Sequence, residues 1–241
     1  MTSTSTQNPK ITPLRKEAHG ALKISHEKAY AHVAQEHLLP VTAHEFVLAS
    51  AEYPIVFVKN EQKNIYQPVV LLGLSAKQNV FVDDGDWQGI YIPVAARNYP
   101  LALVRDAADS ELLFVAIDES SPRVVSEGGE ALFNEDGTES KFLIQRKEHM
   151  AEFIELSKVT AKFTAKLQSL DLFKQQILTL KVQNEEQRIN GVYLVDEQKL
   201  ADLDDETLLD LHRSGYLKVI YAHLLSLQQT QKLVRKIDQA S

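Results

Sequence analysis

Histidine is the side chain most often used to bind a transition metal, and five of the eight histidines lie in one N-terminal segment. Successive histidines there are five to seven residues apart, whereas two neighbouring ligands on one helix need a spacing of about three or four. The sequence therefore favours surface and capping roles, and it predicts no metal and no cofactor. The five residues are His19, His26, His32, His37 and His44.

Two serines lie in motifs that resemble nucleophile motifs but are incomplete. Gly73-Leu-Ser75-Ala-Lys77 lacks the final glycine of the Gly-x-Ser-x-Gly elbow, and Ser25-His-Glu-Lys28 lacks the elements that accompany Ser-x-x-Lys in β-lactamases. The chain has no cysteine, which excludes thiolate chemistry and disulfides. It also has no glycine-rich phosphate-binding loop, so nothing in the sequence supports nucleotide binding.

An enzymatic site would have to be assembled by the fold from the C-terminal block of the chain. The candidate catalytic residues are Tyr221, His212, His223 and Asp196. A structural interpretation is also available for each of them. His212 ends a predicted helix, where a cation suits the dipole, while a buried tyrosine and histidine can join two helices by hydrogen bonds. The acid-rich stretch 196–210 is typical of helix caps and a solvated face.

The only tryptophan follows a turn that is rich in carboxylates, Asp83-Asp84-Gly85-Asp86-Trp87. Such a turn could hold calcium, but the further ligands and the terminal glutamate of an EF-hand are missing. Aromatic residues and prolines follow closely, and large aromatic side chains dominate protein interfaces. This edge is therefore the predicted binding site for a protein or peptide. Its residues are Trp87, Asp84, Asp86, Tyr91 and Tyr99.

The composition is that of an ordinary globular protein, with 44% hydrophobic and 24% charged residues in 241. The formal charge of −7 argues against broad nucleic-acid binding through phosphate neutralisation. The longest apolar runs are far shorter than the roughly 20 residues that span a bilayer. No secretory signal is recognisable at the N-terminus, so we expect a cytoplasmic protein. The sequence does not indicate the oligomeric state.

The sequence predicts a disordered tail over residues 1–23, because residues 2–13 are polar and have little to bury. A single α+β domain is expected over residues 24–241. Its first element is a helix from Ile24 to about His37, which Pro40 stops. Thr42 and Glu45 have the spacing of a capping box, and a second short helix follows them.

Residues 54–137 have the sequence pattern of a β-meander, with short apolar runs separated by polar turns. Because no long helices separate the strands, they should pair antiparallel. A helical turn is expected through Val94–Asn98. The predicted strands are Ile55–Lys59, Gln67–Leu74, Val80–Asp83, Leu101–Arg105 and Leu112–Ile117. The predicted turns are Asn60–Asn64, Ser75–Asn79 and Ala107–Ser110.

Residues 138–241 are mainly helical in pattern, and the fold class is α+β. A long helix over 139–170 should lie against the largely antiparallel sheet of the N-terminal half. A hairpin of Ile177–Val182 and Ile189–Val195 should follow, and then two short helices between Asp196 and Gly215, one of them capped by Asp204. A final helix is expected from Leu217 to about Ile237.

Several strings occur together in an order that resembles the SapC family of bacterial proteins, over about residues 39–234. They include Glu52-Tyr-Pro-Ile-Val-Phe-Val, Pro68-Val-Val-Leu-Leu-Gly-Leu, Asn79-Val-Phe-Val-Asp, Leu211-His-Arg-Ser-Gly-Tyr-Leu and Ile220-Tyr-Ala-His-Leu-Leu-Ser-Leu. The resemblance implies a link to a surface layer or to peptide or nutrient uptake, and it brings no established catalytic residues. The peptide-transporter permease that shares the name is unrelated.

Two functions follow from these observations. The leading hypothesis is a protein- or peptide-binding assembly factor without catalysis of its own, acting through the edge around Trp87. The alternative is an enzyme, or an enzyme accessory, with a site formed by the C-terminal tyrosine and histidine residues. A pocket lined by those side chains would favour the enzyme, and an exposed apolar surface near Trp87 would favour the binding protein.

Overall fold

The computed structural model describes residues 9–105, 113–183 and 185–240 and divides the chain into two compact units. The first unit comprises residues 1–32, 84–86 and 97–154, and the second comprises residues 33–83, 87–96 and 155–241. Each unit contains antiparallel strands and helices, which confirms the α+β class. The predicted turn Ala107–Ser110 lies outside the described residues.

The first unit contains two small sheets, each of three antiparallel strands, with the orders β1-β9-β8 and β10-β2-β11. Its core is formed by Ile24, Leu101, Ile117, Leu132, Leu143 and Met150. Leu143 and Met150 are seven residues apart on α4, a spacing that places both on one helix face. The elements are β1 (Ile11–Pro13), α1 (Lys16–His19), β2 (Lys23–Ile24), β8 (Leu101–Arg105), β9 (Leu113–Asp118), β10 (Val124–Val125) and β11 (Glu130–Ala131).

The prediction of a disordered tail is wrong for its described C-terminal part. Residues 11–13 form β1, which pairs antiparallel with β9 in the register Thr12↔Ile117. In addition to this strand pairing, the Lys10 amide donates to the Asp118 carboxylate at 3.0 Å and the Thr12 hydroxyl donates to Glu119 at 2.7 Å. Backbone pairing and polar contacts hold residues 10–13 in place. Neither kind of contact produces a hydrophobic pattern in the sequence, so the sequence did not indicate this order.

The predicted helix over 24–37 is also wrong. Ile24 lies in β2, Lys28 has a left-handed φ of 46°, and only a 3₁₀ helix at Ala31–Val33 remains. Arg123 provides the physical reason. Its guanidinium takes the carbonyls of Ser25 and Ala29, which a helix would have used for its own hydrogen bonds.

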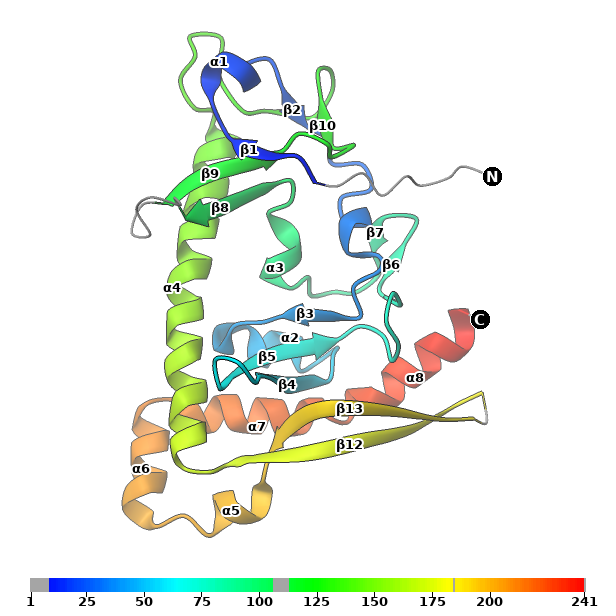
Figure 1. Cartoon of the computed structure of the whole chain (residues 1–241), viewed down its shortest axis with the longest axis vertical. Helices are drawn as coiled ribbons and strands as arrows, with labels where there is room; N and C mark the ends of the chain where they lie inside the picture. Colours follow the sequence, from blue (N-terminus) through cyan, green and yellow to red (C-terminus); the bar gives the residue numbers. More distant parts are fainter. Residues whose placement is uncertain (1–8, 106–112, 184, 241) are drawn as a thin grey trace. The chain divides into compact units, whose positions relative to one another are not determined.

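The second unit is built on a five-stranded antiparallel sheet with the order β12-β13-β4-β5-β3 (Figure 1). The strands are β3 (Leu38–Pro40), β4 (Ile55–Asn60), β5 (Ile65–Leu71), β12 (Phe173–Val182) and β13 (Glu185–Val195). The predicted C-terminal hairpin is therefore confirmed, and it extends the sheet by pairing with β4 at Val192↔Val58. The predicted strands at 55–59 and 67–74 correspond to β4 and to β5, which ends three residues earlier than expected.

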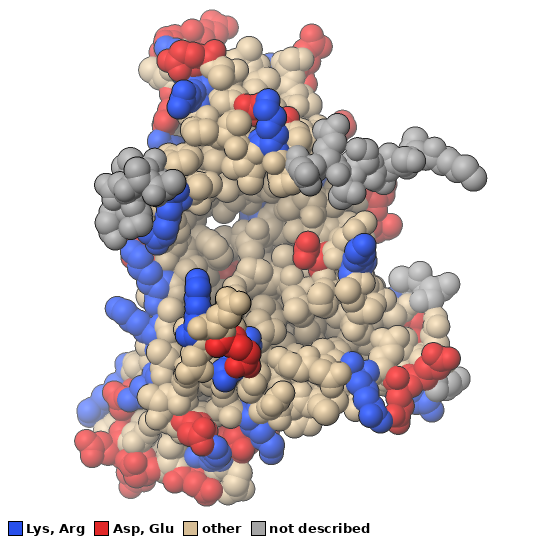
Figure 2. All heavy atoms as spheres, in the orientation of Figure 1, with Lys and Arg blue, Asp and Glu red and all other residues tan. Residues whose placement is uncertain are grey.

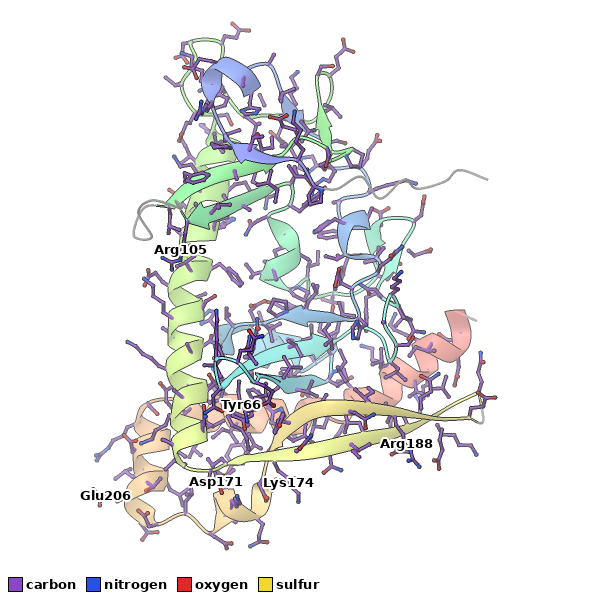
Figure 3. The ribbon with its side chains drawn as sticks, viewed as in Figure 1. Tyr66, Arg105, Asp171, Lys174, Arg188 and Glu206 are labelled. Atoms are coloured by element: carbon purple, nitrogen blue, oxygen red, sulfur yellow. The ribbon has the colours of Figure 1, made fainter. Side chains whose placement is uncertain are left out.

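Aromatic rings fill the core of the second unit between the sheet and its helices. Phe57 on β4 lies with its ring centroid 4.8 Å from that of Phe173 and 5.0 Å from that of His223. Helix α7 packs on β4 and β13, so the helix-rich part covers the sheet as predicted. Tyr66, labelled in Figure 3, stacks on Phe173 at 4.0 Å.

The remaining elements are short except for the predicted long helix, which is α4 (Lys141–Ser169). They are a 3₁₀ helix (Ala43–Glu45), α2 (Phe46–Ala49), β6 (Val82–Asp83), β7 (Asp86–Trp87), α3 (Val94–Arg97), α5 (Glu197–Ala201), α6 (Asp205–Arg213), α7 (Tyr216–Ser226) and α8 (Gln229–Ala240). The capping box at Thr42 and Glu45 is confirmed, as is the Asp204 cap, which accepts from the Thr207 amide at 2.8 Å.

The single final helix predicted for 217–237 is wrong, because α7 ends at Ser226 and α8 begins at Gln229. At the break the Thr230 amide and hydroxyl both donate to the Leu227 carbonyl. The break also shifts the buried face. Leu233 and Ile237 are buried in α8, where an unbroken helix would have continued the stripe through Val234.

None of the helices in the described part of the chain is both long and apolar enough to cross a membrane.

Candidate functional site

Trp87 and Tyr91, two residues of the predicted binding edge, lie together in the second unit. The Trp87 indole is half-buried, and its Nε1 donates to the Tyr53 hydroxyl at 3.0 Å and to the Tyr91 carbonyl at 3.1 Å. Its ring centroid lies 6.3 Å from that of Tyr53 and 6.4 Å from that of Phe81. The tryptophan therefore anchors the loop over residues 87–94, which we call the Ile90 loop.

Two buried glutamates hold the far side of this loop. Glu45 Oε1 accepts from the Tyr91 hydroxyl and from the Val94 amide, both at 2.9 Å, while Oε2 accepts from the Thr42 amide at 2.8 Å. Glu52 Oε2 accepts from the Tyr91 amide at 2.6 Å. Charge-assisted hydrogen bonds of this kind offset the cost of burying a carboxylate, so these glutamates act as fixed anchors.

Tyr53 completes the anchorage, and we call Glu45, Glu52 and Tyr53 the carboxylate clamp. The fully buried Tyr53 hydroxyl accepts from Trp87 and donates to the Tyr91 carbonyl. Burial raises the pKa of Tyr53, so the group stays a neutral hydroxyl. Gly89 lies against it, since a Cβ there would be 2.5 Å from the Tyr53 oxygen. Only glycine fits at this point of the loop.

The clamp fixes a loop whose tip is an almost fully exposed isoleucine. Ile90 is 96% exposed and lies between Gly89 and Tyr91. Four further exposed apolar side chains of the second unit lie on α2 and α7, two helices that contact each other, while others lie on α4, α6, β5 and β12. The four on α2 and α7 are Val47, Leu48 (61% exposed), Tyr221 (53%) and Leu225 (63%). Two contacting helices that both expose apolar side chains can serve as a contact surface.

The other three residues of the predicted edge belong to the first unit. Asp84 is exposed and forms an ion pair with Lys28 at 2.5 Å. Asp86 is exposed as well. The Tyr99 hydroxyl donates to Asp118 Oδ2 at 3.1 Å, and its ring stacks on His32.

The C-terminal candidates are not joined to one another. No hydrogen bond or ion pair links any two of Tyr221, His212, His223 and Asp196, all of which lie in the described part of the chain. His223 is fully buried, with Nδ1 bonded to the Ile55 carbonyl at 2.9 Å and Nε2 accepting from the Val195 amide at 3.1 Å. Burial lowers its pKa to about 4, so it is a neutral tautomer that joins α7 to two strands.

The remaining C-terminal candidates have separate surroundings. Asp196 caps α5 by accepting from the Gln198 amide at 3.0 Å, while Tyr221 and His212 are exposed. A cavity of about 350 Å³ lies on α4 and α6, and none of the four candidates lines it. Its walls are Lys166, Glu206, Thr207, Leu209, Asp210 and Arg213. Figure 2 shows acidic and basic side chains interspersed over α5 and α6, as expected of a solvated face.

The histidine segment forms no metal centre in the described residues, where no three side chains from His, Cys, Asp and Glu are placed to hold an ion. His19 is buried and contacts Glu119 Oε1 at 3.1 Å. His44 is exposed, and His26 lies 3.5 Å from Glu130. His19 and His26 thus serve local contacts of the fold.

Sequence reasoning missed most of the clamp. Glu45 was recognised as a helix cap, but its second oxygen reaches residues 91 and 94, a contact between distant segments that a capping box does not indicate. Glu52 and Tyr53 carry no local signal of their own and belong only to the string that resembles the SapC family. A usable signal was present at Gly89-Ile90-Tyr91, where an isoleucine stands in a polar turn beside a glycine.

The fold and the site define a class of α+β protein that presents an apolar loop on a rigid polar anchorage. The chain belongs to the SapC family, whose family model matches residues 14–233. No curated protein and no solved structure matches the chain.

Proposed function

We propose that this SapC protein is a binding or assembly factor that engages a protein or peptide partner through the Ile90 loop, without catalysis of its own. The observation that supports this is the 96% exposure of Ile90 on a loop fixed at Trp87, Tyr91 and Val94. Exposed isoleucine is unfavourable in water, and a freely moving loop would tend to bury it. The anchorage keeps it outside.

A fixed apolar tip is well suited to binding because the loop loses little further conformational entropy when a partner covers it. Its chemistry implies an apolar pocket or groove on the partner, since isoleucine offers no hydrogen bond. The exposed Val47 and Leu48 of α2, which lie between Glu45 and Glu52 in the sequence, offer further apolar surface in the same unit. Aromatic and apolar anchors of this kind dominate interface energetics.

The resemblance to SapC proteins suggests a partner from a surface-layer or nutrient-uptake system, and an assembly role fits that setting. No contact within residues 9–105, 113–183 and 185–240 supports the alternative enzymatic function. His223 uses both ring nitrogens in the fold, and Tyr221 contributes an exposed ring next to Leu225 on α7. The proposed function therefore contains no catalytic step.

The proposal is tested by comparing two isoleucine variants in affinity capture from the native cell. Ile90→Ser should lower recovery of a specific partner at least about tenfold, which corresponds to about 1.4 kcal/mol of binding. Ile65→Ser is the matched control, because Ile65 is a half-exposed isoleucine on β5 of the same unit. The partner is then purified, and its affinity for each variant is measured by calorimetry.

Unchanged thermal stability is expected for both variants, since both side chains are exposed. If the partner binds Ile90→Ser and Ile65→Ser equally well, the Ile90 loop is not the contact and the proposal fails.

A further inference from the structure

The first unit contains a buried cation with no carboxylate partner among the described residues. Arg123 is only 7% exposed. Its Nε donates to the Ser25 carbonyl at 2.9 Å, and Nη1 donates to the carbonyls of Ala29, at 3.2 Å, and Tyr99. Within the described part of the chain Nη2 donates to nothing. Backbone carbonyls satisfy the hydrogen bonds of a guanidinium, but they do not neutralise its charge.

A second guanidinium adds to this positive charge. Arg146 lies over the Phe142 ring at 5.1 Å and donates to the Arg97 carbonyl at 3.2 Å. Burial and then the charge of Arg146 lower the pKa of Arg123, which means that the environment disfavours the cation. An arginine stays charged nonetheless. The region is electropositive, and an anion would stabilise it.

Unpaired polar atoms lie beside this cation. The His32 ring stacks on Tyr99 with centroids 4.2 Å apart, and both of its ring nitrogens are buried without a hydrogen bond. Asn98 Oδ1 is buried and unbonded in the same way. A neutral imidazole carries one donor and one acceptor, and leaving them unmade costs free energy. Native proteins rarely leave several such atoms together.

Tyr99 connects these groups. Its carbonyl bonds to Arg123, its ring stacks on His32, and Asn98 precedes it in the chain. The charge of Arg123 also lowers the pKa of His32. We call Arg123, His32, Asn98 and Tyr99 the arginine cluster, all of whose members belong to the first unit.

We propose that the arginine cluster is a binding site for a small oxyanion, a carboxylate or a phosphate. Arg123 Nη2 has two N–H groups to offer, His32 has one, and the Asn98 amide supplies a further donor when its oxygen and nitrogen are exchanged, since the two look alike in shape. Donors directed at one oxyanion from a guanidinium, an imidazole and an amide are a common means of anion recognition. No cluster residue belongs to the Ile90 loop, so this inference stands apart from the proposed function.

The experiment follows the Cε1–H signals of the histidines by NMR while inorganic phosphate, acetate or chloride is added at constant ionic strength and mildly acidic pH. His32→Gln assigns the His32 signal. We expect a saturable shift of that signal with phosphate or acetate, and only the small shift common to all salts with chloride. The exposed His212 should not show the saturable shift.

The two probes distinguish the source of the anion. Saturation by phosphate alone indicates a phosphate ligand, and saturation by acetate alone indicates a carboxylate. In Arg123→Gln the shift should disappear. Because that variant loses three bonds to the backbone and can fail to fold, Asn98→Leu is the second test, with apparent affinity lowered at least about tenfold. If neither probe saturates the His32 signal, or Asn98→Leu binds as well as the wild type, the proposal is overturned.

Discussion

The carboxylate clamp and the arginine cluster are both buried polar groups centred on a tyrosine, but they differ in how completely their atoms are bonded. In the clamp both oxygens of Glu45 accept hydrogen bonds, and the Tyr53 hydroxyl both donates and accepts. In the arginine cluster the ring nitrogens of His32 and the Oδ1 of Asn98 have no hydrogen-bond partner among the described residues.

This difference separates two uses of buried polarity. A fully bonded network has no capacity for a ligand and serves to fix the backbone, which is how the clamp holds the Ile90 loop. A partly bonded network carries a free-energy cost that a ligand can remove. The carboxylate clamp therefore contributes to binding indirectly, by holding Ile90 in an exposed position. The arginine cluster contributes by binding a ligand itself.

The largest effect is expected from removing a clamp carboxylate. Glu45→Leu leaves the Thr42 and Val94 amides and the Tyr91 hydroxyl without their acceptor. We expect the free energy of unfolding to fall by about 3–4 kcal/mol, measured by denaturant titration. Glu61→Gln is the control and should change it by less than about 0.5 kcal/mol, because Glu61 is exposed. A loss below about 1 kcal/mol for Glu45→Leu would show that the clamp is not a stabilising network.

The next effect concerns the packing of Gly89 against the clamp. Gly89→Ala places a methyl group 2.5 Å from the Tyr53 oxygen and 2.8 Å from Trp87 Nε1. We expect a loss of about 2 kcal/mol in unfolding free energy, with weaker partner binding because the loop must move. In a Tyr53→Phe background the same change should cost about 1 kcal/mol less, since the oxygen is gone. Equal costs in both backgrounds would place the strain elsewhere.

The pH dependence of stability compares the fully buried His223 with the half-buried His32. Burial lowers the pKa of His223 and of His32 to about 4, against 6.5 for an unperturbed histidine. For His32, burial is the largest cause that lowers the pKa, and the charge of Arg123 is the second. The Ala29 carbonyl raises this pKa, although it forms no hydrogen bond of normal geometry with the ring. Between these pKa values the unfolded state binds more protons, so stability is complete above about pH 6.5 and decreases toward pH 4.

Each histidine should lower the unfolding free energy by about 2 kcal/mol between pH 7 and pH 5, at about 1.4 kcal/mol per pH unit. His32→Gln should therefore make the profile shallower, measured by urea unfolding at both pH values. His212→Gln, at an exposed position, should leave it unchanged. A bound anion should also flatten the profile of the wild type, by favouring protonated His32. A His32→Gln profile identical to that of the wild type would contradict the buried neutral state.

The fold could be predicted from the sequence where its signals are local, but not where distant segments make contact. Short apolar runs predicted β4 and β8, and Thr42 with Glu45 predicted a cap, because each signal is local. The clamp and the arginine cluster depend on contacts between residues 45 and 91 or 25 and 123, which leave no periodic trace. The error over 24–37 has that origin, since Arg123 binds carbonyls that the predicted helix needed.

The smallest effect is expected where a polar group is removed from the arginine cluster. Asn98→Leu deletes an oxygen that has no partner and keeps the bond from the Leu101 amide to the Asn98 carbonyl, which is backbone. Replacing an unsatisfied polar group with an apolar one of similar volume is nearly neutral or stabilising, so we expect a change between zero and about +1 kcal/mol in unfolding free energy. Differential calorimetry without added anion measures it. The changes in unfolding free energy for Asn98→Leu and Glu45→Leu are expected to have opposite signs. This pair gives the most direct comparison of the arginine cluster with the carboxylate clamp, because both variants replace a polar side chain by leucine. A destabilisation of about 2 kcal/mol at Asn98 would mean that its oxygen is bonded after all, for example by an ordered water, and the contrast between the two clusters would be lost.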